Sequence, residues 1–374
     1  MLMLHIFVGI VGFILICIIL QDAFETTVLP RRVSRKVRLT RIFYFATWQL
    51  WSMIAHKLRS LDRRENFLSY YGPLSLILLL VVWALGLVLG FASLQFACGS
   101  GISAPEKVVS FWTDLYLSGT TFFTLGLGDV TPLSPLAKIL TIVECGTGFG
   151  FLALVIGYLP VNYQSFSRRE VGISLMDAHA GSPPTAVEIL RRHSRGLVMP
   201  ELLEHLHDWE NWCANLLESH LSYTVLMFYR SQHDRQSWLA ALTAILDVTA
   251  LLAVGIDDVP EQTALFTFAI ACHAAIDLGQ AIAIPVDASQ IDRLAHSDFE
   301  RLRAQLKEIG ITLHDEETAE KRLAELRQKY EPYVIALARR LYMPLPGWLV
   351  EEESADDWQT SSWSHKEQTA TQAG

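Results

Sequence analysis

The sequence predicts an all-α membrane protein with three membrane-spanning helices, a re-entrant helix between the second and the third, and a helical bundle after them. Two observations lead to this fold class. The 374-residue chain is 51% hydrophobic with a mean hydropathy of +0.28, which is more apolar than soluble globular proteins usually are. Residues 1–169 hold 14 Lys and Arg against 8 Asp and Glu, whereas residues 170–374 hold 16 against 31. A basic, apolar front and an acidic back indicate a membrane part followed by a water-exposed part, and the acidic part argues against nucleic acid as a partner.

The first predicted span is the apolar run from Leu4 to Leu20, because about 17 residues are enough for the shortest helix that crosses a bilayer. No Lys or Arg precedes this run and a basic cluster follows it, so we expect a retained helix rather than a cleaved signal peptide. The second and third apolar runs of spanning length are Pro73 to Ala97 and Pro135 to Leu159.

The basic residues predict how these spans are oriented. Ten of them lie between the first and second spans: Arg31, Arg32, Arg35, Lys36, Arg38, Arg41, Lys57, Arg59, Arg63 and Arg64. The positive-inside bias makes such a loop cytoplasmic. We therefore expect a multi-pass protein of the cell membrane, with the N-terminus outside and the C-terminal domain in the cytoplasm.

Within the basic loop, Tyr44, Trp48 and Trp51 recur at helical spacing beside Arg38 and Arg41. This pattern is typical of a helix that lies in the membrane interface. An ordinary amphipathic helix packed on protein explains it equally well.

A polar, glycine-containing segment separates the second and third spans: Ser118-Gly-Thr-Thr-Phe-Phe-Thr-Leu-Gly-Leu-Gly-Asp129-Val-Thr-Pro132. We expect a helix before it that begins near Ser103, where Ser103 and Glu106 have capping-box spacing, and ends near Phe123. Such a helix would direct its partly negative C-terminus into the bilayer, where it favours a cation.

The residues after this helix have the pattern of an ion filter. A filter replaces the water shell of an ion with backbone carbonyls, and aligning successive carbonyls requires backbone angles that glycine reaches without strain, here at Gly126 and Gly128. Thr121-x-x-Thr124-Leu-Gly-Leu-Gly-Asp129 resembles the T-x-x-T-V-G-Y-G-D signature of potassium channels of the prokaryotic type, which have one pore loop between two transmembrane helices. The resemblance covers residues 73–169. It implies a K⁺ filter formed by Thr124, Leu125, Gly126, Leu127, Gly128 and Asp129.

The sequence also departs from that signature. Leu127 stands where the signature has Tyr, and Tyr116 and Leu117 stand where many members of the family have tryptophans in the pore helix. Those aromatic rings brace the filter through hydrogen bonds, whereas Leu braces only by packing. The G-L-G version is similar to the second pore loops of two-pore-domain potassium channels, so potassium and weakly selective cation conduction both remain open.

One pore loop per chain implies a homotetramer, because a closed ring of carbonyls needs four loops. Gly148 in the third span falls where the resemblance places the hinge glycine of the inner helix. A gating bend at Gly148 and close helix packing through a small residue are the two interpretations.

Glu144 is the acid inside the third span, and an intramembrane carboxyl needs a partner or a wet cavity. One interpretation places it behind the filter, where it accepts hydrogen bonds from Ser118, Thr120 or Thr121 and supports the filter. The other places four such carboxylates around the inner cavity, where they concentrate cations. The first is favoured because Glu144 lies one helical turn before Gly148.

The whole chain divides into five predicted regions: an N-terminal span and basic segment at 1–72, a pore domain at 73–169, a linker at 170–185, an all-α cytoplasmic domain at 186–350 and a disordered acidic tail at 351–374. Leu239 to Ile256 and Thr263 to Ile284 are apolar enough to suggest further spans. Asp247 and Asp277 in their middles are costly in lipid, so we expect buried helices of the bundle instead.

Glu201, His205 and Asp208 share one helix face at i, i+4 and i+7. Such a stripe is either a site for a divalent metal that opens the pore or an ordinary solvated face. No phosphate-binding or nucleophile motif accompanies it. We therefore expect no enzyme and no cofactor.

These features predict a tetrameric, potassium-channel-like cation channel in a lipid bilayer that conducts monovalent cations. Its gating would respond to an unknown signal or ligand acting on the cytoplasmic domain. A weakly selective channel and a non-conducting membrane-anchored sensor or scaffold are the alternatives.

Overall fold

The computed structural model describes residues 2–29, 38–104, 109–194, 199–232, 236–255, 261–282, 285–286, 292–313 and 316–349. The chain divides into two compact parts, unit 1 (Met1–Gln164) and unit 2 (Ser165–Gly374). Each unit is helical throughout its long elements, and the protein is an all-α membrane protein as predicted. The expected acidic tail, residues 351–374, lies outside the described residues.

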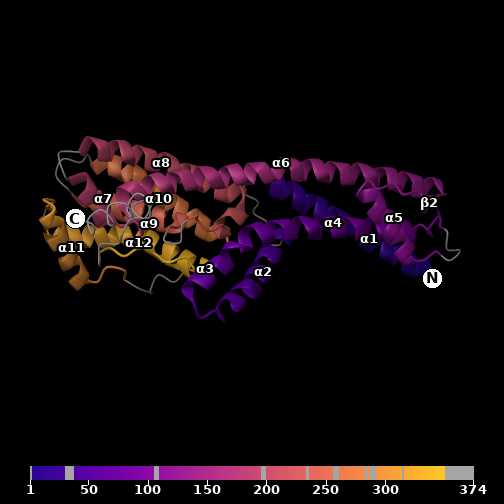
Figure 1. The fold of residues 1–374 in the computed structure, drawn as a ribbon, viewed down its shortest axis with the longest axis horizontal. Helices are drawn as coiled ribbons and strands as arrows, with labels where there is room; N and C mark the ends of the chain where they lie inside the picture. Colours follow the sequence, from indigo (N-terminus) through magenta and orange to yellow (C-terminus); the bar gives the residue numbers. More distant parts are fainter. Residues whose placement is uncertain are drawn as a thin grey trace, which may run out of the picture. The chain divides into compact units, whose positions relative to one another are not determined.

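Unit 1 contains the predicted spans and the pore loop (Figure 1). Its elements are α1 (Leu2–Thr27), α2 (Leu39–Ala55), α3 (Leu61–Ser69), α4 (Tyr71–Ala97), β1 (Ile102–Ser103), α5 (Phe111–Phe122), β2 (Thr131–Pro132) and the first part of α6 (Pro135–Ala180). The three predicted spans are helices, and each observed helix extends beyond its predicted span. The helix that we expect to be re-entrant is α5, which begins eight residues later than expected from Ser103, because Ser103 belongs to β1.

Small residues let α1 and α4 pack side by side (Figure 1). A Cβ at Gly12 would lie 2.7 Å from Ser93 Cβ and 2.8 Å from the Gly90 carbonyl oxygen, and a Cβ at Gly86 would lie 2.3 Å from Ile19 Cδ1. Close approach through small residues is the usual packing between helices in lipid, where there is no hydrophobic force between them.

Helix α2 packs on α4 through its aromatic face. Trp48 is 1% exposed and meets the ring of Tyr71 edge-on at 4.7 Å, while the Tyr71 hydroxyl donates to the Tyr44 carbonyl at 3.2 Å. At its N-terminus, Thr40 donates its backbone N–H to the buried carboxylate of Asp22 on α1. The face that carries Tyr44 and Trp48 therefore packs on protein, which is the second of the two interpretations of this pattern.

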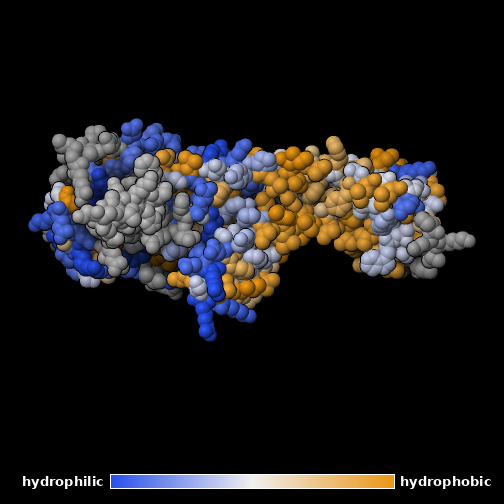
Figure 2. Space-filling view, in the orientation of Figure 1, coloured by the Kyte–Doolittle hydropathy of each residue, from blue (hydrophilic) through white to orange (hydrophobic). Residues whose placement is uncertain are grey.

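On the face drawn in Figure 2, much of the surface over the long helices of unit 1 is apolar. On α1, for example, Phe7 is 64% exposed and Phe13 is 61% exposed, and on α6 Ile142 is 71% exposed. By length and composition, four helices in the described part of the chain can cross a membrane: α1, α4 with the preceding α3, α6, and α10 (Glu261–Ala281). The first three are the predicted spans, and α10 is the one that we expect in the bundle.

Unit 2 is an α-helical bundle, and its core helix is α9 (Trp238–Gly255). The other elements are the end of α6, α7 (Ala186–Ser194), α8 (Met199–Ser222), the 3₁₀ helix η1 (Thr224–Phe228), α10, α11 (His296–Glu308) and α12 (Glu316–Leu341). Every residue of α9 from 238 to 254 is buried. Its Asp247 accepts from Arg293 at 2.7 and 3.0 Å and from the Tyr330 hydroxyl at 2.5 Å. A paired, protein-covered Asp247 supports the assignment of this apolar helix to the bundle.

The segment predicted as a linker, residues 170–185, is largely helical. Helix α6 continues to Ala180 and ends where Gly181 adopts φ +75° and donates its N–H to the Asp177 carbonyl. A glycine in the left-handed region is a common helix end, and Pro183 and Pro184 prevent continuation. Residues 170–180 are therefore helical, and the division of the chain into five regions stays a prediction.

Candidate functional site: the loop between α4 and α6

The predicted pore loop of unit 1 is held together at both ends. β1 before α5 pairs antiparallel with β2 after the glycine segment, with Ile102 opposite Pro132. Ile102, Leu117 and Val130 form one small apolar core beneath the loop. The chain therefore enters and leaves the loop at neighbouring points, and the residues between α5 and β2 have fixed ends.

Helix α5 is anchored by polar contacts along its length. The backbone N–H of Ser110 donates to Thr113 Oγ1 at 3.2 Å, which organises the first turn. Asp114, 0% exposed, accepts from the Ser100 hydroxyl at 2.6 Å. The helix ends at Phe122, close to the predicted Phe123.

The backbone after α5 alternates in handedness. Thr124, Gly126 and Gly128 have φ of 55°, 57° and 78°, whereas Leu125 and Leu127 between them do not lie at positive φ. A ring of ion-binding oxygens requires successive carbonyls on one side of the chain, and left-handed residues at every second position are compatible with that arrangement. The Leu125 N–H also donates to the Thr120 carbonyl at 2.8 Å and joins this segment to α5.

Thr124 is strained in this arrangement. A β-branched residue at positive φ is a conformational outlier that costs about 1–3 kcal/mol and persists where surrounding structure determines it, often at functional sites. The next two apolar side chains are open to the surroundings of the single chain, with Leu125 62% and Leu127 63% exposed. Residues 124–129 thus form a strained segment whose apolar side chains are uncovered within one chain.

Tyr116 supports the far end of the same segment. Its hydroxyl donates to Asp129 Oδ2 at 2.9 Å. A side chain of α5 is therefore hydrogen-bonded to the last of the six predicted filter residues. In the sequence, Tyr116 stands out only because it occupies a position where many potassium channels have tryptophan. Its hydroxyl could have indicated a role in holding this segment, because a tyrosine hydroxyl can donate to a carboxylate as an indole N–H does.

Glu144 on α6 is buried against α5 within the single chain. Ser118 and Glu144 are both 0% exposed, and the Ser118 hydroxyl contacts Glu144 Oε1 at hydrogen-bonding range and the Val88 carbonyl of α4 at 2.7 Å. Of the three predicted donors, Ser118 is thus in place, whereas the Thr120 hydroxyl donates to the Leu117 carbonyl of its own helix. A supporting role for Glu144 in conduction stays a prediction.

Gly148, the candidate gating hinge, is a point of close packing. A Cβ at Gly148 would lie 2.0 Å from the carbonyl oxygen of Phe122, the last residue of α5. Helix α6 continues through this position without interruption. The close-packing interpretation therefore has a direct structural basis, and bending at Gly148 stays a prediction.

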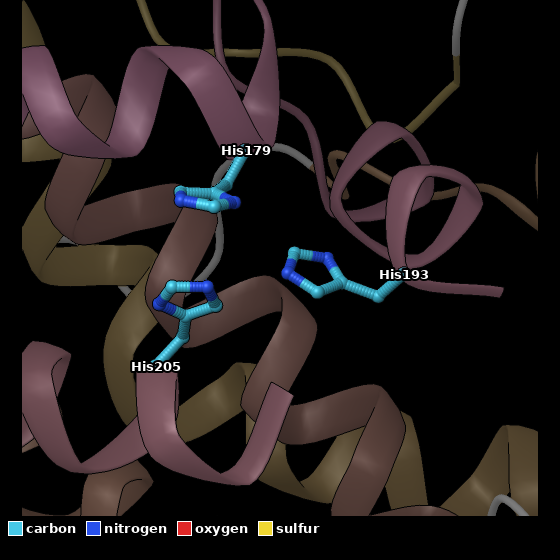
Figure 3. A group of neighbouring side chains, drawn as sticks. All are labelled: His179, His193 and His205. Carbon is cyan, nitrogen blue, oxygen red and sulfur yellow. The ribbon is translucent and has the colours of Figure 1, made fainter. Parts of the chain in front are cut away.

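The predicted metal stripe is not the group that the structure assembles in unit 2. His205 on α8 lies beside His179 at the end of α6 and His193 on α7, and one ligand nitrogen from each ring lies within 4.8 Å of the others (Figure 3). Asp208 is exposed and is not part of this described group, and the side chain of Glu201 lies outside the described residues. Spacing along the sequence identifies residues on the same face of one helix. It could not identify this cluster, whose residues come from three helices.

Comparison with known proteins supports a membrane channel domain. Residues 77–162 match a family model described as an ion channel. The chain is 28% identical over 206 residues to an uncharacterized membrane protein, YdjJ, of Bacillus subtilis (strain 168), with 52% of this chain and 56% of that relative covered. The chain thus matches little more than half the length of this relative. No solved structure matches. The part of the chain from α4 to α6 is therefore similar to an ion channel domain.

Proposed function

We propose that the chain is one subunit of a tetrameric, potassium-channel-like cation channel that conducts through residues 124–129. The alternation of positive φ at Thr124, Gly126 and Gly128 carries this proposal, since a segment with such an alternation after a helix C-terminus is suited to present its carbonyls to a cation. The similarity of residues 77–162 to an ion channel family supports it independently.

The open apolar side chains of the segment support assembly. Leu125 and Leu127 are more than 60% exposed in one chain, and fully burying a leucine side chain is favourable by about 1.5–3 kcal/mol. Four copies around one axis would cover these side chains and close the carbonyl ring. We place the loop at the outer side of a cell membrane and unit 2 in the cytoplasm, where a ligand or signal acting on the bundle gates the pore.

The second candidate is a weakly selective cation channel. Leu127 has no hydroxyl with which to hold the filter at one diameter, which favours this candidate. The bond between Tyr116 and Asp129 favours the potassium-selective one, because it restrains the same segment from the α5 side. The two candidates differ in K⁺ over Na⁺ preference, not in assembly.

Ion flux through the purified protein in liposomes tests both. We expect K⁺ flux down a gradient, little Na⁺ flux, and four copies per particle by native mass spectrometry. Gly126→Ala should abolish flux and leave the tetramer largely intact, since Ala disfavours φ of 57°. Equal K⁺ and Na⁺ flux selects the weakly selective channel, and absence of any flux from an intact tetramer rejects conduction.

A further inference from the structure

We propose that His179, His193 and His205 form a binding site for a divalent transition metal of the Zn²⁺ type in unit 2. The three imidazoles come from three different elements, α6, α7 and α8, and converge on one point (Figure 3). This site is independent of the filter, and its test does not depend on conduction.

The distances between the rings fit a shared metal ion. The ring centroids of His179 and His205 lie 4.0 Å apart, and His193 lies 5.4 Å from the first and 5.3 Å from the second. Nitrogens within 4.8 Å of one another leave room for an ion about 2.0–2.1 Å from each after small side-chain rotations. His193 is 5% exposed, so the site is partly shielded from water.

Hydrogen bonding orients at least one ring for this role. His193 Nδ1 lies 2.7 Å from the Ile189 carbonyl oxygen. A carbonyl accepts only, so Nδ1 carries the proton, and Nε2 of the neutral ring keeps its lone pair. Metal-binding histidines commonly donate their other ring N–H to a backbone carbonyl, which fixes both the tautomer and the ring orientation.

The donor set selects the kind of ion. Three imidazole nitrogens suit Zn²⁺, Cu²⁺ or Ni²⁺, whereas Ca²⁺ and Mg²⁺ prefer oxygen ligands. Three protein ligands also leave a fourth position for water or another ligand. A bound ion would tie the end of α6 to α7 and α8, on both sides of the turn that contains Gly181.

Metal titration of the full-length protein in detergent, after removal of metal by a chelator, tests the site. We expect one Zn²⁺ per chain and a rise in Tm of about 5–10 °C when free Zn²⁺ is about 100-fold above the Kd. Mg²⁺ at the same concentration should leave Tm unchanged. Absence of a tightly bound Zn²⁺ from the folded wild-type protein overturns the proposal.

Two histidines on α8 provide a matched pair of variants. His205→Gln should weaken Zn²⁺ binding by at least about 10–100-fold, because that is the loss when only a residue hydrogen-bonded to a metal ligand is replaced. His207→Gln should bind as the wild type does, because His207 is 74% exposed and faces Glu210 instead. Equal affinity of the two variants overturns the proposal. If His205→Gln does not fold, Co²⁺ added to the wild type decides, since three-histidine coordination gives tetrahedral visible absorption and its absence rejects the site.

Discussion

The hydroxyl of Ser118 on α5 donates to the carboxylate of Glu144 on α6, and both side chains are fully buried. The same hydroxyl also contacts the Val88 carbonyl at 2.7 Å. One short side chain therefore links α5 both to α4 and to α6. The second oxygen of Glu144, Oε2, is buried without a hydrogen-bond partner in the described structure, so the acid is held by few contacts.

We predict that Glu144→Gln conducts close to wild type, because the amide oxygen still accepts from Ser118. Glu144→Ala leaves the hydroxyl without this acceptor and opens a cavity, which costs about 1–3 kcal/mol or more. It should lose selectivity or tetramer stability, measured by K⁺ and Na⁺ flux and by native mass spectrometry. If Glu144→Gln instead lowers conductance most at low salt, the carboxylate faces the ion path and the supporting role is wrong.

Tyr116→Phe removes the hydroxyl that holds Asp129 and keeps the ring. Both partners of this hydrogen bond are exposed in the single chain, so water weakens it and we expect a modest effect. The ratio of K⁺ to Na⁺ flux should fall while the tetramer persists. Tyr70→Phe is the control, because Tyr70 is 64% exposed and lies outside the loop. An unchanged ratio in Tyr116→Phe would show that this bond does not shape the filter.

Features that depend on local pattern could be predicted from the sequence. The spans at 4–20, 73–97 and 135–159 are helices because apolar length alone specifies a membrane helix. The sequence also predicts that α5 ends near Phe123 and that Glu144 contacts Ser118. Both depend on helix geometry, which fixes how far along a span a residue lies.

Features that depend on contacts between segments far apart in the sequence could not be predicted. His179 and His193 lie on separate helices, and no spacing rule joins them to His205. The bond from Tyr116 to Asp129 requires the chain to fold back along α5. The start of α5 was missed for another reason: Ser103 pairs with Thr131 in a two-residue ladder, and this tertiary contact overrides its capping pattern.

Gly148→Ala should disrupt the contact between α6 and α5. The added Cβ would lie 2.0 Å from a backbone carbonyl, which cannot rotate away as a side chain can. Overpacking of this kind costs about 1–3 kcal/mol, so we expect a lower Tm and weaker K⁺ flux. Gly146→Ala, two residues earlier on α6, is the matched control because its Cβ meets no atom within 4 Å in the chain. A Gly148→Ala protein as stable as Gly146→Ala would contradict the packing.

Buried His220 predicts a loss of stability in mild acid. Burial, and then the neighbouring Arg169, lowers its pKa well below 6.5, so the folded protein keeps it neutral. As pH falls through about 6.5 the unfolded chain takes up the proton and the folded one does not, which disfavours folding by up to about 1.4 kcal/mol per pH unit. Thermal unfolding between pH 7 and pH 5 should therefore show a decreasing Tm. His220→Gln should show a shallower decrease, and His273→Gln, 63% exposed at its side chain, should keep the wild-type slope.

Asp247 tests whether α9 is a core helix of the bundle. Asp247→Asn keeps the size of the side chain and removes the charge that Arg293 faces at 2.7 Å, which leaves a buried guanidinium with Glu331 at 3.3 Å as its remaining acid. Removing one partner of a buried ion pair costs about 3–5 kcal/mol, so the purified protein should unfold at a clearly lower temperature. Asp298→Asn alters an exposed pair with Arg301 and should change stability by no more than about 0.5 kcal/mol. Similar Tm values for the two variants would mean that Asp247 is not buried against Arg293, and the assignment of α9 to the interior of unit 2 would fail.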